Sequence, residues 1–386
     1  MKFIHAADLH LDTPFTGISK YSLEVQNKLK KSTYSAAKKV FETAVEENVD
    51  FIILAGDVFD NTERSLSAQT FLNEQFIRLQ ENNIDVFIIY GNHDYFRNDL
   101  GILEYPSNVH VYGQDVETIR YVSKDNKTVD LTGFSYYQQH IDEKMIEKFP
   151  TRGTADYQIG ILHGGIGDDN YAPFQISELV SKGYDYWALG HIHKREILNQ
   201  NPYIIYPGDT QGRNQNETGI KGFYLVDMNS NQVNIEFKES SEYIFDVKNI
   251  AISKDESLKA IIDDISALLV DDNTLVTLNI NHAENLDENV IRMIDRGELQ
   301  DQFKNNSDSL LYKIYLNYNP GNTLSTIDEK YWNISSENVF DLNDIKDLDN
   351  KLFNVDLIRN RINESDFLDD IKEKTQNIIN KKSAGE

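Results

Sequence analysis

The chain has 386 residues, of which 40% are hydrophobic, so it is long enough for two or three domains with buried cores. It contains no cysteine, which excludes disulfide frameworks, thiolate zinc sites and cysteine nucleophiles. Its formal net charge of −25 disfavours a module that grips nucleic acid through phosphates alone. The sequence has neither a signal-peptide pattern nor an apolar run of about 18 residues, so we expect a soluble, cytoplasmic protein.

The first part of the chain alternates short apolar runs with amphipathic helical patterns. Apolar runs predict strands at residues 3–6, 51–54 and 86–90, and helical periodicity predicts helices at residues 22–47 and 67–82 between them. This β-α-β-α-β order predicts a parallel sheet with helices on its faces. Ligands of such sheets bind at the carboxyl ends of the strands.

The hydrophobic pattern changes from residue 109 onward. Short alternating strands with polar turns lie within residues 109–134 and suggest antiparallel pairs. Helices are expected at residues 142–149 and 177–182, and further strands at residues 159–162, 184–189, 204–206, 222–227 and 233–237. The sequence therefore predicts an α/β fold with two sheets packed between helices, and a first domain at residues 1–242.

A second series of predicted strands and helices begins beyond residue 242. Strands are expected at residues 244–250, 274–280 and 311–316, with helical patterns at residues 257–270 and 287–303. We therefore expect a small separate α/β domain at residues 243–320. Residues 321–386 have little strand signal and predict a charged helical tail.

Metal-binding side chains follow five of the predicted strands. Because the carboxyl ends of parallel strands meet at one edge of a sheet, these side chains could converge. An Asp-x-His or His-x-His pair alone is more often an ordinary loop, and Asn and Asp also serve turns without chemistry. Five coincident strand ends favour a two-metal site with Asp57 as its bridge, which could clamp a phosphodiester. The predicted metal ligands are Asp8, His10, Asp57, Asn92, His163, His191 and His193.

These strand ends resemble the signature of calcineurin-like metallophosphoesterases. The motifs are Asp8-x-His10, Gly56-Asp57-x-x-Asp60, Gly91-Asn92-His93-Asp94, His163-Gly164-Gly165 and Gly190-His191-x-His193. The first two also resemble the SbcD-like branch of DNA-repair exonucleases, and within it the bacterial YhaO type. The resemblance implies a four-layer α/β-β/α sandwich, a C-terminal cap domain and two Mn²⁺ ions. One ion would be held by Asp8, His10, Asp57 and His193, and the other by Asp57, Asn92, His163 and His191.

Three further residues are candidates for the chemistry. His93 adjoins a predicted ligand without being needed for coordination, so we expect it to donate a proton to the leaving oxygen or to stabilise the charged transition state. Asp94 is expected to orient His93. The glycine-flanked Arg213 could contact a substrate phosphate, although a surface arginine is nearly as consistent with the sequence.

The leading hypothesis is a Mn²⁺-dependent DNA exonuclease or endonuclease, a subunit of a DNA-repair nuclease. The acidity of the chain keeps open a phosphodiesterase of nucleotides or other small phosphoesters, and a third alternative is a non-catalytic regulatory subunit of an ATPase complex. The resemblance also implies a homodimer and an SbcC-like or YhaN-like coiled-coil ATPase as partner. Residues 341–382 would then dock on that ATPase, while a helical appendage packed on its own domain is an equal alternative.

Overall fold

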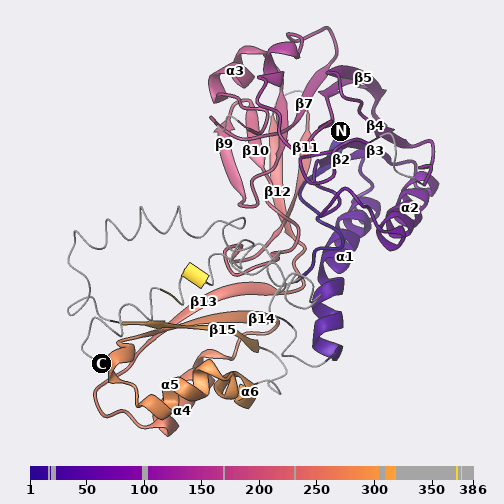
Figure 1. Cartoon of the computed structure of the whole chain (residues 1–386). Helices are drawn as coiled ribbons and strands as arrows, with labels where there is room; N and C mark the ends of the chain where they lie inside the picture. The colour runs from indigo at the N-terminus through magenta and orange to yellow at the C-terminus, as the bar shows by residue number, and fades with distance from the viewer. Residues whose placement is uncertain are drawn as a thin grey trace, which may run out of the picture. The chain divides into compact units, whose positions relative to one another are not determined.

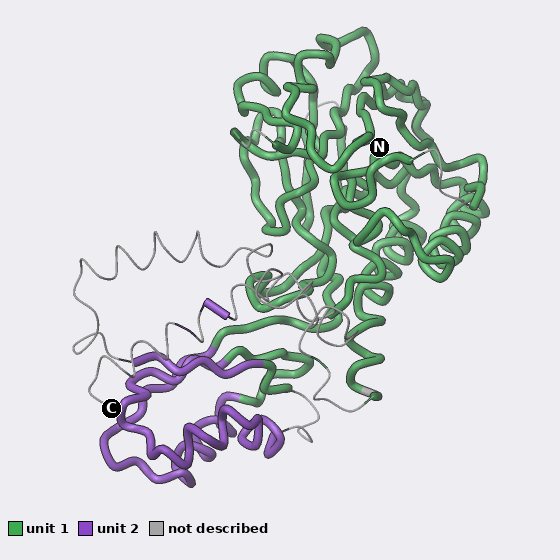
Figure 2. Tube along the Cα trace, in the orientation of Figure 1, with its two compact units in different colours: residues 1–247, 269–277, 304–312 green, residues 248–268, 278–303, 313–386 purple. Residues whose placement is uncertain are grey.

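The computed structural model describes residues 1–15, 18, 23–97, 103–167, 170–229, 232–303, 309–318, 371–372 and 375. Two compact units are distinguished by their internal contacts (Figure 2). The first comprises Met1–Val247, Leu269–Thr277 and Lys304–Tyr312, and the second comprises Lys248–Leu268, Leu278–Phe303 and Lys313–Glu386. Of the predicted helical tail at residues 321–386, all but three residues lie outside the described part.

The first unit contains two six-stranded sheets (Figure 1). The first sheet has the order β12-β11-β1-β2-β3-β4, from Val233–Glu239, Gly222–Met228, Lys2–Ala6, Phe51–Ala55, Asp85–Ile89 and Val109–Val111. The second has the order β5-β6-β7-β8-β10-β9, from Glu117–Val122, Thr128–Gly133, Tyr157–His163, Tyr186–Gly190, Tyr203–Tyr206 and Glu196–Gln200.

The central strands are buried on both faces, and alternate side chains serve different cores. In β2, Phe51 and Ile53 lie in the core between the two sheets, while Ile52 and Leu54 pack with α1 (Leu23–Glu46) and α2 (Leu66–Glu81). Behind the second sheet, a third core contains Trp187 together with residues of α3 (Ile176–Ser181) and the 3-10 helix η2 (Met145–Lys148). The layers therefore run helix, sheet, sheet, helix, which confirms the predicted sandwich.

Three local predictions were wrong. The helix expected at residues 142–149 is only the four-residue η2. Strand β4 pairs parallel with β3, the preceding strand, instead of forming an antiparallel pair, because the residues 90–108 between them are enough for the crossover that a parallel pair requires. Strand β9, which was not predicted, pairs antiparallel with β10.

The later part of the chain has a three-stranded sheet of order β13-β14-β15, from Ile244–Ala251, Thr274–Asn281 and Ser309–Asn317. Helices α4 (Leu258–Leu268), α5 (Glu288–Asp295) and α6 (Glu298–Phe303) accompany it (Figure 1). The single helical stretch predicted at residues 287–303 was wrong, since Gly297, at φ +75°, separates α5 from α6. Among the described residues, no helix combines the length and apolar composition that a bilayer crossing requires.

Candidate metal centre

Five parallel strand ends bring the predicted ligands to one edge of the sandwich. Strands β1, β2 and β3 run parallel in one sheet, and β7 and β8 run parallel in the other. The backbone turns sharply where these strands end, with positive φ at four predicted ligands: Asp8 (52°), His10 (43°), Asp57 (49°) and His191 (102°). Residues other than glycine rarely adopt a positive φ, and those that do are concentrated at functional sites.

The imidazoles of His10 and His193 point at the same place. Their Nε2 atoms are 3.2 Å apart, and His10 Nε2 lies 3.9 Å from Asp57 Oδ2. One donor atom from each of these three residues falls within a group whose members are all within 4.8 Å of one another. We call this place the His10 position.

A second group of donors surrounds His163. Its Nε2 atom lies 3.3 Å from Asp57 Oδ2 and 3.0 Å from Asn92 Oδ1, and that oxygen is 3.1 Å from His191 Nδ1. We call this place the His163 position. Asp8 belongs to the group of Asp57 and His163, and it also accepts the backbone N–H of His191. The pairing of Asp8 with the ion at the His10 position stays a prediction.

The hydrogen bonds around His163 leave electron pairs facing one another. A carbonyl oxygen only accepts, so His163 Nδ1 donates to Ala55 O at 3.0 Å and its Nε2 lone pair faces the oxygens of Asp57 and Asn92. Asp57 Oδ2 is buried and has no hydrogen-bond donor in the part of the chain that the structure describes. Such a convergence is stable only when a positive charge lies within it, either a proton on His163 Nε2 in the metal-free protein or a bound metal ion.

The shifted pKa values of His163 and Asp8 also indicate that this centre favours a positive charge. Burial lowers the pKa of His163, but the carboxylates of Asp57 and Asp8 outweigh burial and raise it to about 9. Burial raises the pKa of Asp8, and the nearby carboxylate of Asp57 raises it further. Carboxylate, amide and imidazole donors suit hard and borderline divalent ions. The donor set therefore fits two divalent cations that share Asp57.

Comparison with known proteins agrees with this geometry. A model of the calcineurin-like phosphoesterase family matches residues 1–195. The chain belongs to the calcineurin-like phosphoesterase family. It is 40% identical over 267 residues to the uncharacterized metallophosphoesterase YhaO of Bacillus subtilis, covering 68% of this chain and 65% of that protein. It is also 29% identical over 250 residues to the DNA double-strand break repair protein Mre11 of Methanocaldococcus jannaschii, covering 61% and 64%.

The chain thus spans slightly under two thirds of each of these curated relatives. Among solved structures, a dimetal phosphatase from Danio rerio aligns over 63% of this chain and 97% of its own, at 11% identity and a TM-score of 0.39.

His93 and Asp94 of this phosphoesterase have separate tasks. His93 Nδ1 lies 2.9 Å from the carbonyl oxygen of Asp60, which fixes its ring. The carboxylate of Asp94 instead accepts backbone N–H groups from Gly91, at 2.7 Å, and Val58, at 2.8 Å. The prediction that Asp94 orients His93 is therefore corrected, since Asp94 ties the loop after β3 to the loop after β2.

Two charged residues that the sequence did not single out also shape these loops. The guanidinium of Arg64 lies 3.9 Å from the ring centre of Tyr90 and donates to Asp94 O at 2.6 Å. Glu217, in the segment that follows β10, lies 2.9 Å from His193 Nδ1. Neither residue belongs to a strand-end motif, although a buried carboxylate behind a metal-binding histidine is a common arrangement.

The structure pairs Arg213 with carboxylates. Its side chain is 11% exposed, and its guanidinium donates to Glu217 and Asp60. A contact between Arg213 and a substrate phosphate stays a prediction.

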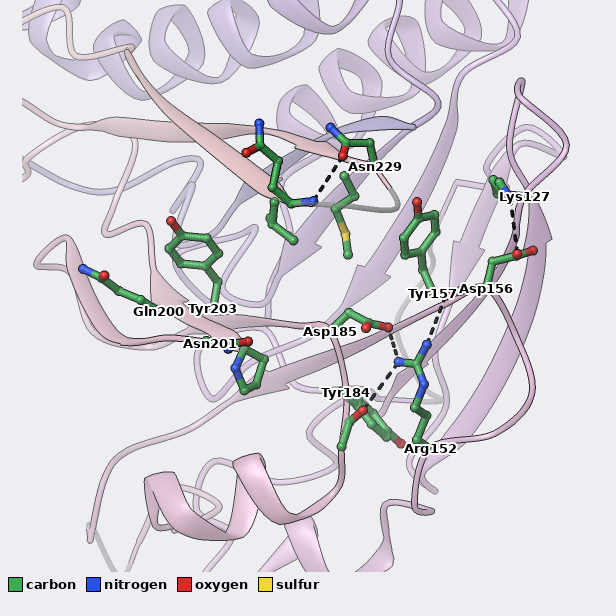
Figure 3. Close-up of a pocket in the computed structure, with 15 residues that line it drawn as sticks. Lys127, Arg152, Asp156, Tyr157, Tyr184, Asp185, Gln200, Asn201, Tyr203 and Asn229 are labelled. Carbon is green, nitrogen blue, oxygen red and sulfur yellow. Dashed lines mark hydrogen bonds and ion pairs between the residues drawn. The ribbon is translucent and has the colours of Figure 1, made fainter.

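A separate cavity of about 860 Å³ lies at the other end of the strands (Figure 3). Tyr157 at the start of β7 lines it, and the six residues from there to His163 span about 20 Å. Its charged side chains are paired with one another, Arg152 with Asp185 and Lys127 with Asp156. This cavity contains none of the predicted site residues.

Proposed function

We propose that the protein is a Mn²⁺-dependent phosphodiesterase that cleaves DNA, as a subunit of a DNA-repair nuclease. The observation that carries this proposal is the convergence of carboxylate, amide and imidazole donors from five strand ends around two adjacent positions. The name of the Mre11 relative, a DNA double-strand break repair protein, supports DNA as the substrate. The mixture of oxygen and nitrogen donors supports Mn²⁺, which accepts both.

Two divalent ions bound here would neutralise a phosphodiester and lower the pKa of a water molecule for attack on phosphorus. The protein supplies the geometry. Asp57 reaches both positions, and its Oδ1 atom accepts the backbone N–H of His93 at 2.9 Å. Because the Asp60 carbonyl accepts the Nδ1 proton of His93, the Nε2 atom faces the other way and can give a proton to the leaving oxygen when the ring is in its doubly protonated, imidazolium form.

The acidity of the chain favours a second candidate, a phosphodiesterase of nucleotides or other small phosphoesters. With 38 basic against 63 acidic residues, the protein offers little general attraction to a polyanion. The two arginines described near the centre, Arg64 and Arg213, are largely buried and already contact protein groups. A small phosphoester needs no extended basic surface.

One assay separates these candidates. Purified protein with Mn²⁺ is offered single-stranded DNA, double-stranded DNA and a chromogenic phosphodiester, in parallel with an Asp57→Ala variant. DNA cleavage that the variant loses supports the nuclease, and dye release without DNA cleavage supports the small-substrate enzyme. Inactivity on all three substrates would refute both and leave a regulatory subunit.

The proposed partners follow from the nuclease. We propose DNA as substrate, a homodimer, and a coiled-coil ATPase of the SbcC or YhaN kind as the companion subunit. The residues expected to dock on that ATPase, 341–382, lie outside the described part apart from three positions. The cytoplasmic location expected from the sequence stays part of this proposal. Co-purification of the two subunits, followed by size-exclusion chromatography, tests the assembly.

A further inference from the structure

Two carboxylates, the buried Glu217 and the largely buried Asp60, lie behind the two imidazoles of the His10 position. Glu217 Oε1 lies 2.9 Å from His193 Nδ1, at hydrogen-bonding distance, and Asp60 Oδ1 lies 3.4 Å from His10 Nδ1, an ion-pair contact without hydrogen-bond geometry. Each carboxylate contacts the Nδ1 side of its ring, so each ring turns its Nε2 atom toward the same place. A carboxylate in this place fixes the orientation and tautomer of a metal-binding histidine.

Arg213 joins these two carboxylates. Its Nη2 atom lies 2.9 Å from Glu217 Oε1 and its Nη1 atom lies 3.0 Å from Asp60 Oδ1. Its backbone N–H also donates to Glu217 Oε2 at 2.7 Å. Arg213 Nη2 also lies 3.0 Å from His193 Nδ1 and 3.4 Å from His193 Nε2, so the guanidinium packs directly against that ring. One guanidinium thus contacts both carboxylates, Glu217 beside His193 and Asp60 beside His10.

The surroundings hold this arrangement in place. Thr13 Oγ1 donates to Asp60 Oδ1 at 2.7 Å, so that oxygen is fixed from two sides. Lys221 Nζ donates to the carbonyl oxygen of His193 at 3.0 Å and pairs with the buried Asp209 at 2.9 Å.

Arg213 and Glu217 both lie beyond residues 1–195, the part that the family model matches.

We propose that Arg213 is a positioning residue, which holds Glu217 and Asp60 so that His193 and His10 present their Nε2 atoms to one metal ion. The inference rests on the proposed function, because it requires a metal at the His10 position. It assigns Arg213 a task different from contact with a substrate phosphate. The planar guanidinium suits this task, since it can engage two carboxylates at fixed angles, which the point charge of a lysine cannot.

Simple electrostatics and positioning predict opposite effects for an Arg213→Met variant. Removing a positive charge beside a cation site should tighten metal binding if charge alone matters. If Arg213 positions the rings, its loss frees both carboxylates and weakens binding. Mutation of a residue that holds a metal-binding side chain in place typically reduces metal affinity by about tenfold to a hundredfold.

The test is calorimetric titration of Mn²⁺ into metal-free full-length protein, for wild type, Arg213→Met, Arg213→Lys and Glu217→Ala. We expect two ions in the wild type, and one of the two affinities reduced about tenfold to a hundredfold in all three variants. Arg152→Met is the matched control, because it removes an arginine that pairs with Asp185 in the distant cavity (Figure 3). It should bind both ions as the wild type does. Thermal unfolding of the metal-free proteins checks that each variant is folded.

The outcomes are distinguishable. Unchanged or tighter binding of both ions in folded Arg213→Met and Arg213→Lys would overturn the positioning role, and a raised KM for the chromogenic phosphodiester would then assign Arg213 to the phosphate. Weakened binding in Glu217→Ala with normal binding in the Arg213 variants would overturn it too. If the wild type binds no Mn²⁺, the proposed function fails first.

Discussion

Gly91 offers the sharpest steric test of the metal centre. It lies two residues beyond the end of β3, and a Cβ atom added there would lie 2.3 Å from Asp57 Oδ1 and 2.6 Å from His163 Nε2. Real Cβ atoms essentially never approach another heavy atom closer than 3.0 Å, so the carboxylate would have to retreat by at least 3.0 − 2.3 = 0.7 Å. The nearest atoms are all side-chain atoms of the predicted ligands, and an alanine therefore displaces the donors themselves.

We expect Gly91→Ala to fold and to lose metal and turnover. Overpacking of this kind costs about 1–3 kcal/mol, which is less than the stability of most domains. A misplacement of about 1 Å at a reacting centre costs about a hundredfold in rate. Mn²⁺ titration should show weakened binding at the His163 position, and hydrolysis of a chromogenic phosphodiester should fall by about a hundredfold or more.

Gly113→Ala is the matched control, since the nearest atom to its added Cβ would be Glu117 Oε1 at an ordinary 3.7 Å. This variant should keep both ions and full activity. Wild-type metal stoichiometry and turnover in Gly91→Ala would refute the reasoning, because they would mean that the reaction does not need Asp57 and His163 where the structure has them.

Three further predictions concern residues around the centre. His93→Ala should retain both ions and lose about a hundredfold to ten-thousandfold in turnover, because it contributes a proton and no coordination; loss of bound Mn²⁺ would contradict this. Asp94→Asn should lower the free energy of unfolding by about 1–3 kcal/mol in denaturant titrations, since an amide cannot accept the backbone N–H groups of both loops; unchanged stability would contradict the loop-tying role. Burial lowers the pKa of His5 to about 3, so the unfolded chain takes up a proton below pH 6.5 that the folded protein refuses, and stability falls as the pH drops. Between pH 7 and pH 5 the metal-free wild type should lose about 2 kcal/mol more than His5→Gln, and parallel pH profiles would refute this.

The sandwich could be predicted because its strands are short, apolar and separated by long amphipathic helices. The run of residues 51–54 gave β2 within one residue, since both of its faces are buried and no polar residue interrupts it. Strand β9 was missed for the opposite reason. It lies at the edge of its sheet, and its first two residues, Glu196 and Ile197, are exposed. A strand at the edge of a sheet can keep exposed polar residues, so no continuous apolar run marks it in the sequence.

The candidate ligands could be predicted because each lies at the end of a strand or in the loop just after it, where the topology fixes its location. Their supporting residues could not. Glu217 reaches His193 across 24 positions and Arg213 reaches Asp60 across 153, so no local spacing encodes either contact. The predicted role of Asp94 failed for a similar reason, since adjacency in sequence to His93 does not decide which way a carboxylate turns.

Charge explains why metal occupancy and substrate binding should be linked. Buried and largely buried acids outnumber the bases that contact them: Asp8, Asp57, Asp60, Asp94, Asp209 and Glu217 against Arg64, Arg213 and Lys221. Burial raises the pKa of Asp94 to about 6 and that of Asp209 well above its ordinary value, whereas neighbouring histidines outweigh burial and lower the pKa of Asp57, Asp60 and Glu217, which therefore keep their negative charge. A phosphodiester that approached the metal-free centre would meet repulsion at short range in a poorly screened environment. Chelation should therefore abolish substrate binding as well as turnover, and retention of a phosphodiester by the metal-free protein would place the binding site away from the strand ends.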